Sequence, residues 1–406
     1  MRTATQHSVD LGRVVLLGVL LSCILVRIGS TTKCVFGGES TLDKKGIGVH
    51  GRWLTKDGDI WIARGVGLAA FTYAPWYSEP NRTDKFGFHG AAAHFGPKIL
   101  NAAKTWGIDS LRIMVSQPGL DPQSDIYLKK YVEAAVSGIK LCLDEGFVVI
   151  LAMQDQPHSG ETDVKPLPTQ ETLRAWETIG PHFANHPYVM FELFNESGLV
   201  LKNRPRRNLE LWMNGGSHTE ADGTRRNYIG HQTMVNAFRR RGWKNVIVVD
   251  TMPWARRIDA RALAIKDPLG QLAFAVHPYY LKGGATREQW DANFGNAAED
   301  VVVLVNEWFS NSKARFSVQT YDLPQITDDF LAYLREKQIP LWAFAFDIPA
   351  TIVRDYRGTP NNWTRFGRDG VTLGRGGAGC GEQVRRHFQL LMNAPPPRIE
   401  RAGVSP

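Results

Sequence analysis

Cysteine is scarce in this sequence, and the four that occur form no metal-binding or redox motif. Cys23, Cys34, Cys142 and Cys380 lack the short spacings that zinc sites and redox sites need. Cys142 falls on the apolar stripe of a predicted helix, so we expect a buried thiol there. A disulfide between Cys34 and Cys380 has only weak support. No G-x-G-x-x-G follows the first or the third predicted strand, so we expect no dinucleotide, and likewise no metal or other cofactor.

Long apolar runs are also few, and the one near the N-terminus is too short to span a bilayer. Residues 14–26 form an apolar run of 13 residues between Arg13 and Arg27, whereas a membrane-spanning helix needs about 20. The run fits the core of a signal peptide. No A-x-A cleavage site follows it, so an uncleaved membrane anchor is the alternative. In both cases we expect an exported protein, which is periplasmic, extracellular or anchored on the outer side of a membrane.

The charge of the chain is moderately basic, at +8. Its densest clusters are Arg204, Arg206 and Arg207 and then the arginines at 239–241. Such clusters bind nucleic acid in some proteins, but a solvated helix face or loop is the simpler interpretation. We therefore expect no nucleic-acid partner. Attraction to an anionic cell envelope or an acidic polymer is the alternative.

The remaining chain alternates short apolar runs with helical patterns, which indicates an α/β fold. The runs are nearly all apolar, as expected for parallel strands that are covered on both faces. Eight strands in this rhythm predict a (β/α)8 TIM barrel, and a doubly wound sheet is the alternative. The predicted strands are 62–68, 109–115, 147–153, 188–194, 245–250, 271–276, 300–305 and 340–346.

Three further features complete the predicted domain. A hairpin around Asp57 and Gly58 caps the closed end of the barrel. Long loops at 197–226 and 347–378 follow the fourth and eighth strands, on the face where barrel active sites are built. We divide the chain into a signal peptide or anchor at 1–30, a linker at 31–50, the barrel domain at 51–395 and a C-terminal tail at 396–406.

Polar residues at the carboxyl ends of barrel strands face one open mouth. The fourth strand ends in Asn195-Glu196 and the seventh in Asn306-Glu307. Two carboxyl groups about 5–5.5 Å apart are what retaining glycoside hydrolysis requires, one as acid/base and one as nucleophile. The pattern therefore predicts Glu196 and Glu307 as a catalytic pair. The other polar residues predicted at the mouth are Arg112, Gln154, Asp155, His277 and Tyr279.

Several motifs occur in the order found in glycoside hydrolase family 5, the cellulase-like TIM-barrel glycosidases, and the chain resembles a divergent member from about residue 50 to 346. FELFNES resembles the strand-four N-E signature, VLVNEWFS the strand-seven nucleophile signature, LRIMVS the strand-two arginine and FAVHPYY the strand-six H-x-Y. RWLTKDGDIWIARGVGL resembles the opening hairpin and first strand. The resemblance implies that Glu196 is the acid/base and Glu307 the nucleophile, supported by Arg112, Asn195, His277 and Tyr279.

We assign expected tasks to the supporting residues. Arg112 beside Glu307 favours the ionised form of that carboxylate, and Tyr279 donates a hydrogen bond to the same oxygen. Asn195 binds the sugar 2-OH. Trp254, after the fifth strand, is a platform on which a sugar ring stacks.

The chain departs from the family pattern at two strands. Gln154 with Asp155 stands where the family has a histidine after strand three, and His158 is the nearest substitute. Phe344, Phe346 and Asp347 replace the tryptophan near the end of strand eight, because Trp342 is too deep in the strand. The substrate-binding residues that we expect are Arg112, Asn195, His277, Tyr279, Trp254 and Gln154.

We therefore expect an endoglucanase-like retaining glycoside hydrolase that cleaves a β-linked glucan or related polysaccharide through a covalent intermediate. The alternatives are a glucan transglycosylase and a carbohydrate-binding envelope protein with a decayed site. A metal site of His277, Glu196 and Glu307 lacks the usual ligand spacings. The expected partner is a polysaccharide or oligosaccharide, and we expect a monomer that attaches to a membrane only through residues 14–26.

Overall fold

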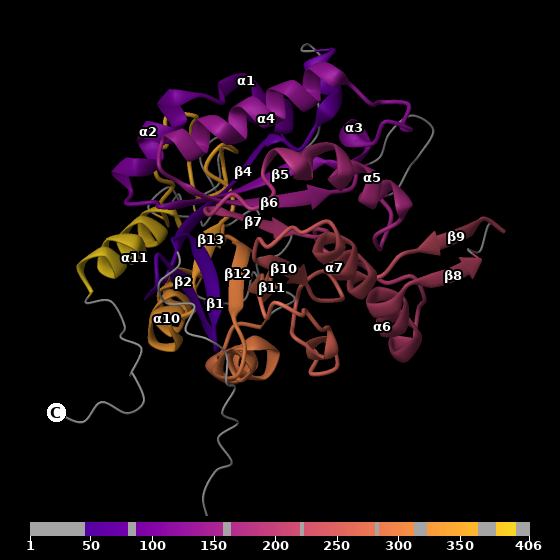
Figure 1. Ribbon diagram of the computed structural model, residues 1–406. Helices are drawn as coiled ribbons and strands as arrows, with labels where there is room; N and C mark the ends of the chain where they lie inside the picture. Colours follow the sequence, from indigo (N-terminus) through magenta and orange to yellow (C-terminus); the bar gives the residue numbers. More distant parts are fainter. Residues whose placement is uncertain are drawn as a thin grey trace, which may run out of the picture. The chain divides into compact units, whose positions relative to one another are not determined.

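The computed structural model describes residues 45–79, 87–156, 164–219, 223–280, 284–311, 323–363 and 379–394. Eight parallel strands form a closed barrel with helices around it (Figure 1). The last strand pairs with the first, since Leu341 lies opposite Arg64. This closure confirms the (β/α)8 prediction and excludes a doubly wound sheet, which would have two open edges. The barrel strands are β4 (Arg64–Phe71), β5 (Ser110–Ser116), β6 (Val148–Gln154), β7 (Val189–Glu192), β10 (Ile247–Asp250), β11 (Leu272–Val276), β12 (Val303–Trp308) and β13 (Leu341–Ala343).

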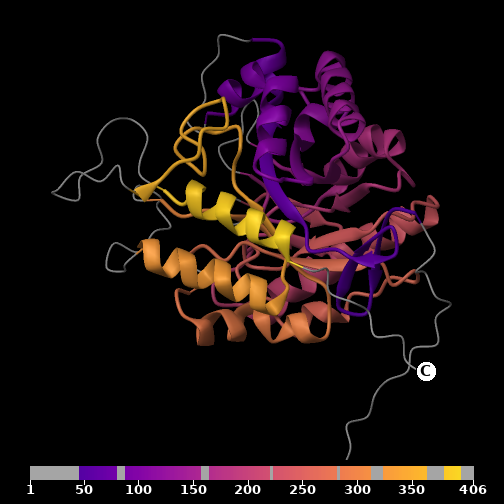
Figure 2. The ribbon, with the colours of Figure 1, turned by 90° about the vertical axis from the view of Figure 1, so that its left-hand side faces the viewer.

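Helices follow most strands and cover the outside of the barrel, and α10 and α11 pack against each other (Figure 2). The longest are α4 and α10. The helices are α1 (Phe88–His94), α2 (Pro97–Thr105), α3 (Gln117–Leu120), α4 (Lys129–Asp144), α5 (Gln170–Ile179), α6 (Pro205–Asn214), α7 (His231–Arg240), α9 (Arg287–Trp290), α10 (Leu323–Lys337) and α11 (Gly381–Asn393).

Strand β6 illustrates why the strands are apolar throughout. Val148 and Ile150 belong to the cluster inside the barrel, whereas Val149, Leu151 and Met153 belong to the larger cluster between strands and helices. Successive side chains of a strand point to opposite faces, and both faces are covered here. The strand therefore has no solvent-facing positions for polar residues except near its carboxyl end.

A three-stranded antiparallel sheet of β1 (Ile47–His50), β2 (Trp53–Lys56) and β3 (Asp59–Ile60) precedes the barrel. Its Leu54 and the following Trp61 join the cluster inside the barrel, where Trp61 packs edge-on against Trp342 at 6.3 Å. The predicted hairpin cap is thus confirmed. Strand β1 corrects the predicted linker, because the last four residues of segment 31–50 pair with β2.

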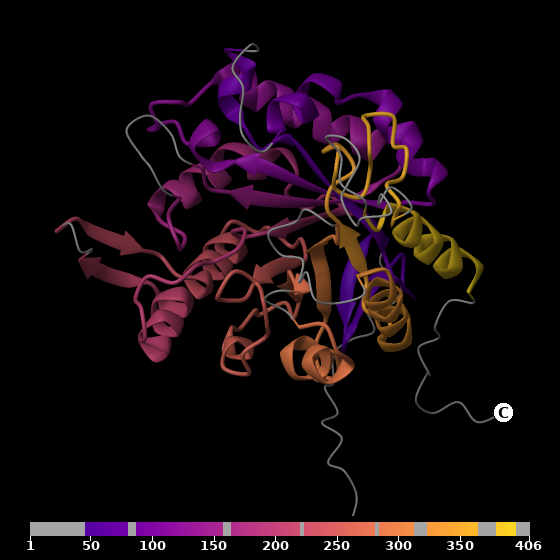
Figure 3. The same ribbon diagram turned by 180° about the vertical axis from the view of Figure 1, so that it is seen from behind.

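The predicted long loop after β7 contains regular structure. Helix α6 and a hairpin of β8 (Gly216–Thr219) and β9 (Arg225–Tyr228) project from the barrel, as Figure 1 and Figure 3 both show. We call residues 197–230 the β7–α7 insertion. It lies at the carboxyl end of β7, beside the mouth of the barrel.

The described cysteines are Cys142 and Cys380, and both are free and buried. Burial raises the pKa of the Cys142 thiol to about 12, and the predicted core thiol is confirmed. Cys380 is free among the described residues and accepts a hydrogen bond from the backbone N–H of Ser310, and its pairing with Cys34 stays a prediction. Cys34, the apolar run at 14–26 and His158 lie outside the described residues. Among the described helices, none combines the length and the apolar character needed to cross a membrane.

Candidate active site

Arg112 is the fully buried centre of the site. It lies in the middle of β5, and its guanidinium forms a two-pronged ion pair with Glu192, at 2.8 Å from Nε and 2.5 Å from Nη2. Its Nη1 donates to Glu307 Oε2 at 2.8 Å, and Nη2 also donates to Asn195 Oδ1 at 2.5 Å. Arginine suits this position because its planar fork donates to several carboxylates at once. One side chain therefore holds three residues from the carboxyl ends of two other strands, β7 and β12.

Glu307 lies on β12 with both carboxylate oxygens occupied. Arg112 binds Oε2, and the hydroxyl of Tyr279 donates to Oε1 at 3.0 Å. The prediction that both donors share one oxygen is therefore wrong, since they bind different oxygens. Burial alone raises the pKa of Glu307, but His277, Arg112 and the Tyr279 hydrogen bond outweigh it and lower the pKa below its ordinary value. The carboxylate is thus held in its ionised form.

Glu196 lies four residues beyond the end of β7 and is more accessible than Glu307. Its side chain is 33% exposed, compared with 12% for Glu307. The backbone has a φ of +48°, and its N–H donates to Asp250 Oδ2 at 2.8 Å. One carboxylate oxygen, Oε1, lies 3.0 Å from His277 Nδ1. The carboxylate is therefore oriented through one oxygen while the rest of it faces the mouth.

His277 follows β11 and interacts with the charges of both Glu196 and Glu307. Asn306 donates through Nδ2 to Glu192 at 2.7 Å, so its Oδ1 accepts from His277 Nε2 at 3.0 Å. Burial lowers the pKa of His277, but Glu307, Asp250 and Glu196 more than offset burial and raise it to about 9. A protonated imidazole therefore stands between the carboxylates.

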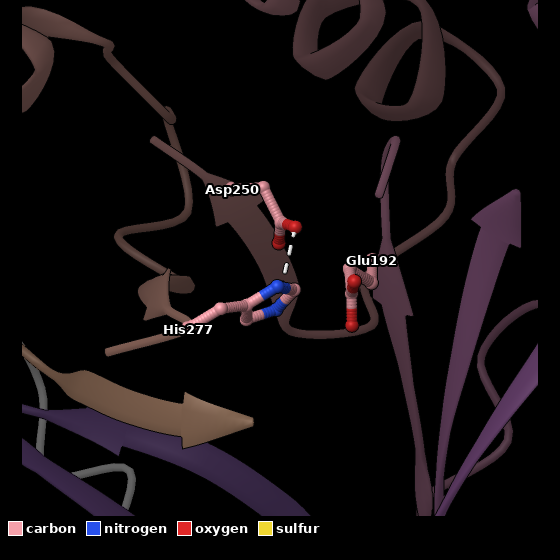
Figure 4. A group of neighbouring side chains, drawn as sticks. All are labelled: Glu192, Asp250 and His277. Carbon is pink, nitrogen blue, oxygen red and sulfur yellow. Dashed lines mark ion pairs between the residues drawn. The ribbon is translucent and has the colours of Figure 1, made fainter. Parts of the chain in front are cut away.

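Asp250 and Glu192 are the two site residues that the sequence interpretation missed. Figure 4 shows them at the ends of neighbouring strands β10 and β7, with the His277 imidazole facing Asp250. Asp250 Oδ2 lies 3.7 Å from His277 Nε2, and both carboxylates are fully buried. Burial raises the pKa of Asp250, and the charge of Glu192 adds to the rise. Their one sequence signal is a charged residue at the end of a run that is otherwise apolar.

The two catalytic candidates meet at the mouth. One carboxylate oxygen of Glu196, one of Glu307 and a ring nitrogen of His277 all lie within 4.8 Å of one another. These three groups do not suit a metal ion. Both His277 nitrogens are hydrogen-bonded, and its raised pKa keeps protonated an imidazole that must be neutral to bind metal. The arrangement instead suits two carboxyl groups that act on one bond.

Asn195 and Gln154 form the next layer of hydrogen bonds. Asn195 accepts from Arg112 and donates through Nδ2 to Gln154 Oε1 at 2.6 Å. Gln154 in turn donates to the backbone carbonyl of Asp155 at 2.8 Å. The Asp155 carboxylate is buried and accepts from Gln117 and from the backbone of Lys165. Gln154, which stands where the family has a histidine after the third strand, thus places a hydrogen-bonded amide next to Asn195.

The aromatic residues near the mouth differ in accessibility. Trp342 is fully buried inside the barrel and donates through Nε1 to Ser110 Oγ at 2.9 Å, as its depth in the strand predicts. Phe346 is also buried, whereas Phe344 after β13 is only partly buried and packs near Phe309. Trp254 is half-buried, and the guanidinium of Arg256 lies 4.5 Å from its ring centroid. One face of the predicted stacking platform therefore carries a cation.

One known family matches most of this barrel in sequence. The family model described as Cellulase (glycosyl hydrolase family 5) matches residues 82–347. None of the curated proteins compared with the chain matches it.

Solved structures share the fold at low identity. A GH5 cellulase from an Icelandic hot spring isolate is 15% identical, with a TM-score of 0.55, over 89% of this chain and 98% of that one. A β-mannanase from Streptomyces thermolilacinus, solved with mannohexaose, is 18% identical, with a TM-score of 0.51, over 75% of this chain and 84% of that one. A mannanase catalytic domain from Streptomyces sp. SirexAA-E is 16% identical, with a TM-score of 0.50, over 78% of this chain and 85% of that one.

Proposed function

Because the chain belongs to glycosyl hydrolase family 5 and is a glycoside hydrolase, we propose that it cleaves a β-linked glucan or mannan with retention of configuration. The observation that carries this proposal is the approach of Glu196 and Glu307, since one carboxylate oxygen of each lies within 4.8 Å of the other. Retaining enzymes hold these groups about 5–5.5 Å apart, whereas inverting enzymes leave about 6.5–9.5 Å for a water molecule. The short separation therefore favours direct attack by one carboxylate.

Glu307 is the nucleophile in this proposal. Its carboxylate attacks the anomeric carbon, the bond to the leaving oxygen breaks, and a glycosyl ester forms on Glu307. Arg112 and Tyr279 keep Glu307 ionised and fix its orientation through one hydrogen bond to each oxygen. Water then attacks the anomeric carbon of the ester and releases the sugar with its original configuration.

Glu196 is the acid and then the base. His277 binds Oε1, which leaves Oε2 to donate a proton to the departing glycosidic oxygen. The protonated imidazole then stabilises the carboxylate that remains. In the second step Glu196 takes the proton back from the attacking water. Asp250 supports this cycle because it binds the Glu196 backbone and faces His277.

The substrate class rests on the related structures and on the aromatic side chains. The neighbours with the same fold include a cellulase and a mannanase solved with mannohexaose. Trp254 and Phe344 are half-buried aromatic rings near the mouth, and aromatic faces suit the apolar faces of sugars. We therefore expect hydrolysis within a panel of β-1,2-, β-1,3-, β-1,4- and β-1,6-glucans and β-mannans.

Two measurements test this function. NMR of the first product formed from a cleaved oligosaccharide should show the β-anomer, which then equilibrates to the α-anomer. A 2-deoxy-2-fluoro glycoside with a good leaving group should inactivate the enzyme and label Glu307, as found by peptide mass spectrometry. Initial release of the α-anomer, or labelling elsewhere, contradicts the retaining assignment. Excess oligosaccharide products at high acceptor concentration would identify a transglycosylase.

We also propose that residues 1–30 direct export. The support is the apolar run at 14–26 between two arginines. Expression of the full chain followed by cell fractionation and N-terminal sequencing tests this. A mature chain that begins after residue 26 indicates cleavage, an intact chain in the membrane fraction indicates an anchor, and an intact chain in the cytoplasm contradicts export.

A further inference from the structure

Building on the proposed function, we propose that the leaving-group side of the site binds an anionic sugar unit through Arg256. The preferred substrate is then an acidic β-glycan. Its negative group is the carboxylate of a uronic acid or a sulfate ester, and both present oxygens to a guanidinium fork. Arg256 then decides which polysaccharide is cleaved fastest, while the chemistry stays with Glu196 and Glu307.

Arg256 is a cation without a carboxylate partner at a half-buried position. Its Nε is buried and has no hydrogen-bond partner, and within the described ranges no acidic side chain lies in ion-pair distance of it. Its guanidinium lies over the ring of Trp254. Some partly buried arginines have a carboxylate partner, such as Arg239 with Asp267 at 2.7 Å, whereas Arg52 and Arg335 bind the Ala298 carbonyl and His387 instead. A buried donor without a partner is costly, so a ligand that supplies an acceptor gains affinity here.

The backbone places Arg256 beside the acid/base. The N–H of Trp254 donates to the carbonyl of Ser197, the residue after Glu196, at 2.7 Å. The N–H of His277 donates to the carbonyl of Ala255, the residue before Arg256, at 2.6 Å. Burial lowers the pKa of Arg256 while the charge of Glu196 raises it. An arginine remains charged throughout, so a fixed positive charge stands near the proton donor.

This position corresponds to the leaving-group side of the cleaved bond. Strand β10, which leads to Arg256, pairs with β7, which leads to Glu196. Glu307 lies on β12, beyond β11 in the barrel order. The acid/base contacts the oxygen that departs, so the sugar attached to that oxygen lies on the Glu196 side. Arg256 is therefore placed to bind the first unit of the leaving group.

The wider surface on this side is also basic. The β7–α7 insertion contains six lysines and arginines against three acidic residues. Lys202, Arg204 and Arg206 are exposed and have no ion-pair partner among the residues that the structure describes. Exposed Arg257, next to Arg256, is likewise unpaired there. A polyanion that leaves the mouth on this side meets positive charge over several sugar units, and the attraction weakens with salt.

In the second arginine cluster of the sequence two of the three arginines are paired, and Arg240 is exposed without an ion-pair partner among the described residues. Arg239 pairs with Asp267 and donates to two backbone carbonyls, and Arg241 pairs with Glu177. These arginines hold the end of α7 in place and serve a structural purpose. Of the two clusters, the one in the insertion is therefore the candidate for binding an acidic polymer.

The test compares three forms of one polymer, β-1,4-glucomannan. They are the neutral polymer, the polymer with C6 groups oxidised to carboxylates, and the polymer sulfated at C6. Wild-type enzyme should have a kcat/KM about tenfold higher on a charged form than on the neutral form, in line with one charge-assisted hydrogen-bond pair. Whether the carboxylated or the sulfated form is preferred identifies the anion. The advantage should shrink as sodium chloride is raised.

Variants assign the preference to Arg256. Arg256→Met should lower the charged-to-neutral ratio of kcat/KM about tenfold, and Arg256→Lys should lower it less because the charge remains without the fork. Arg386→Met, at an exposed arginine of α11 that the proposal does not use, is the control and should leave the ratio unchanged. Melting temperatures confirm that each variant is folded.

The outcomes separate the inference from the proposed function. The inference is wrong if the neutral polymer is cleaved as fast as both charged forms, or if Arg256→Met lowers activity equally on all three. Neither result contradicts the proposed hydrolase function. If no polymer of this set or of the neutral panel is cleaved and the fluoro-glycoside does not label Glu307, the proposed function itself fails. Cleavage of a charged form alone, lost in Arg256→Met, supports both.

Discussion

The two glutamates at the barrel mouth have similar neighbours in sequence but different surroundings in space. Each follows an asparagine after an apolar strand. Glu307 lies within β12 and is bound through both oxygens by Arg112 and Tyr279. Glu196 lies beyond β7, is more exposed, and is bound through one oxygen by His277.

This difference supports the two roles that we propose. A carboxylate that is fixed by two donors, one of which is a cation, stays ionised and is suited to attack carbon. A carboxylate with an accessible oxygen and a protonated neighbour is suited to pass a proton back and forth. The family motif alone names the two residues, but the surroundings explain why they are not interchangeable. The following experiments change one side of this comparison at a time.

The largest effect should come from Glu307→Gln. Gln keeps the shape of the side chain but cannot form the glycosyl ester, so kcat should fall on the order of 10⁴-fold or more. Arg112 still pairs with Glu192 in this variant, so thermal denaturation should report a folded protein. Exposed Glu336→Gln is the control and should retain normal kcat. Turnover by Glu307→Gln close to wild type would show that this carboxylate is not the nucleophile.

Glu196→Ala should have a smaller effect that depends on the leaving group. On a polysaccharide, activity should fall about 10²- to 10⁴-fold, which is the usual contribution of a general acid. On an aryl glycoside with a nitrophenol leaving group the glycosylation step needs no proton, so its rate should fall far less. Added azide should speed the second step and yield a β-glycosyl azide. Equal losses on both substrates would contradict the acid/base role.

His277 should make folding stability depend on pH. Its pKa is about 9 in the folded protein and about 6.5 when unfolded. Protonated His277 therefore contributes about 3 kcal/mol to the free energy of unfolding. This contribution is fully present below pH 6.5 and is lost as the pH rises through about 9. Urea denaturation of wild type and of His277→Gln at pH 6.5 and 9.5 measures the difference.

The control for this pH effect is another buried histidine. Burial lowers the pKa of His231 to about 4, so it does not titrate between pH 6.5 and 9.5 in the folded protein. His231→Gln can lower stability but should preserve the loss between the two pH values. The prediction for His277 is wrong if His277→Gln loses as much stability over this range as wild type.

The smallest effect should come from Tyr279→Phe. Removing the hydroxyl takes one hydrogen bond from Glu307, so kcat/KM should fall about tenfold. The pKa of Glu307 should rise toward its ordinary value, and the acid limb of the pH profile of kcat/KM should move to higher pH. Tyr280→Phe is the matched control, because its hydroxyl contacts Thr327 away from the site. If the acid limb of the pH profile does not move in Tyr279→Phe, then Tyr279 does not influence the pKa of Glu307.

Strand and helix positions were largely predictable, because each depends on a local pattern. All eight predicted strands overlap observed ones, although β13 covers only Leu341–Ala343 of the expected 340–346. Trp342 was also placed correctly, since alternation along β13 sends its ring into the barrel. The hairpin of β8 and β9 was missed, because its polar residues bury little and carry no alternating apolar pattern.

The site was predictable only in part. Glu196 and Glu307 stand at or just beyond strand ends, and Arg112 lies within β5, each in a recognisable motif. Asp250 and Glu192 also end apolar strands, yet their contacts depend on β7 and β10 being neighbours. Trp254 was predicted as a platform for a sugar ring, and the cation that lies over it comes from the fold of the loop after β10.

The sequence by itself determined an α/β fold with eight covered strands and the candidate pair of glutamates. Eight apolar runs with helices between them are covered on both faces in a barrel and also in a doubly wound sheet. The pairing of β13 with β4, which exists only in the tertiary structure, decides for the barrel. The tertiary structure alone decided which charges meet. Arg112 reaches Glu192 and Glu307 across 80 and 195 residues of sequence. Burial and distance set the pKa of each group, and both quantities exist only once the barrel has closed and the strand register is fixed.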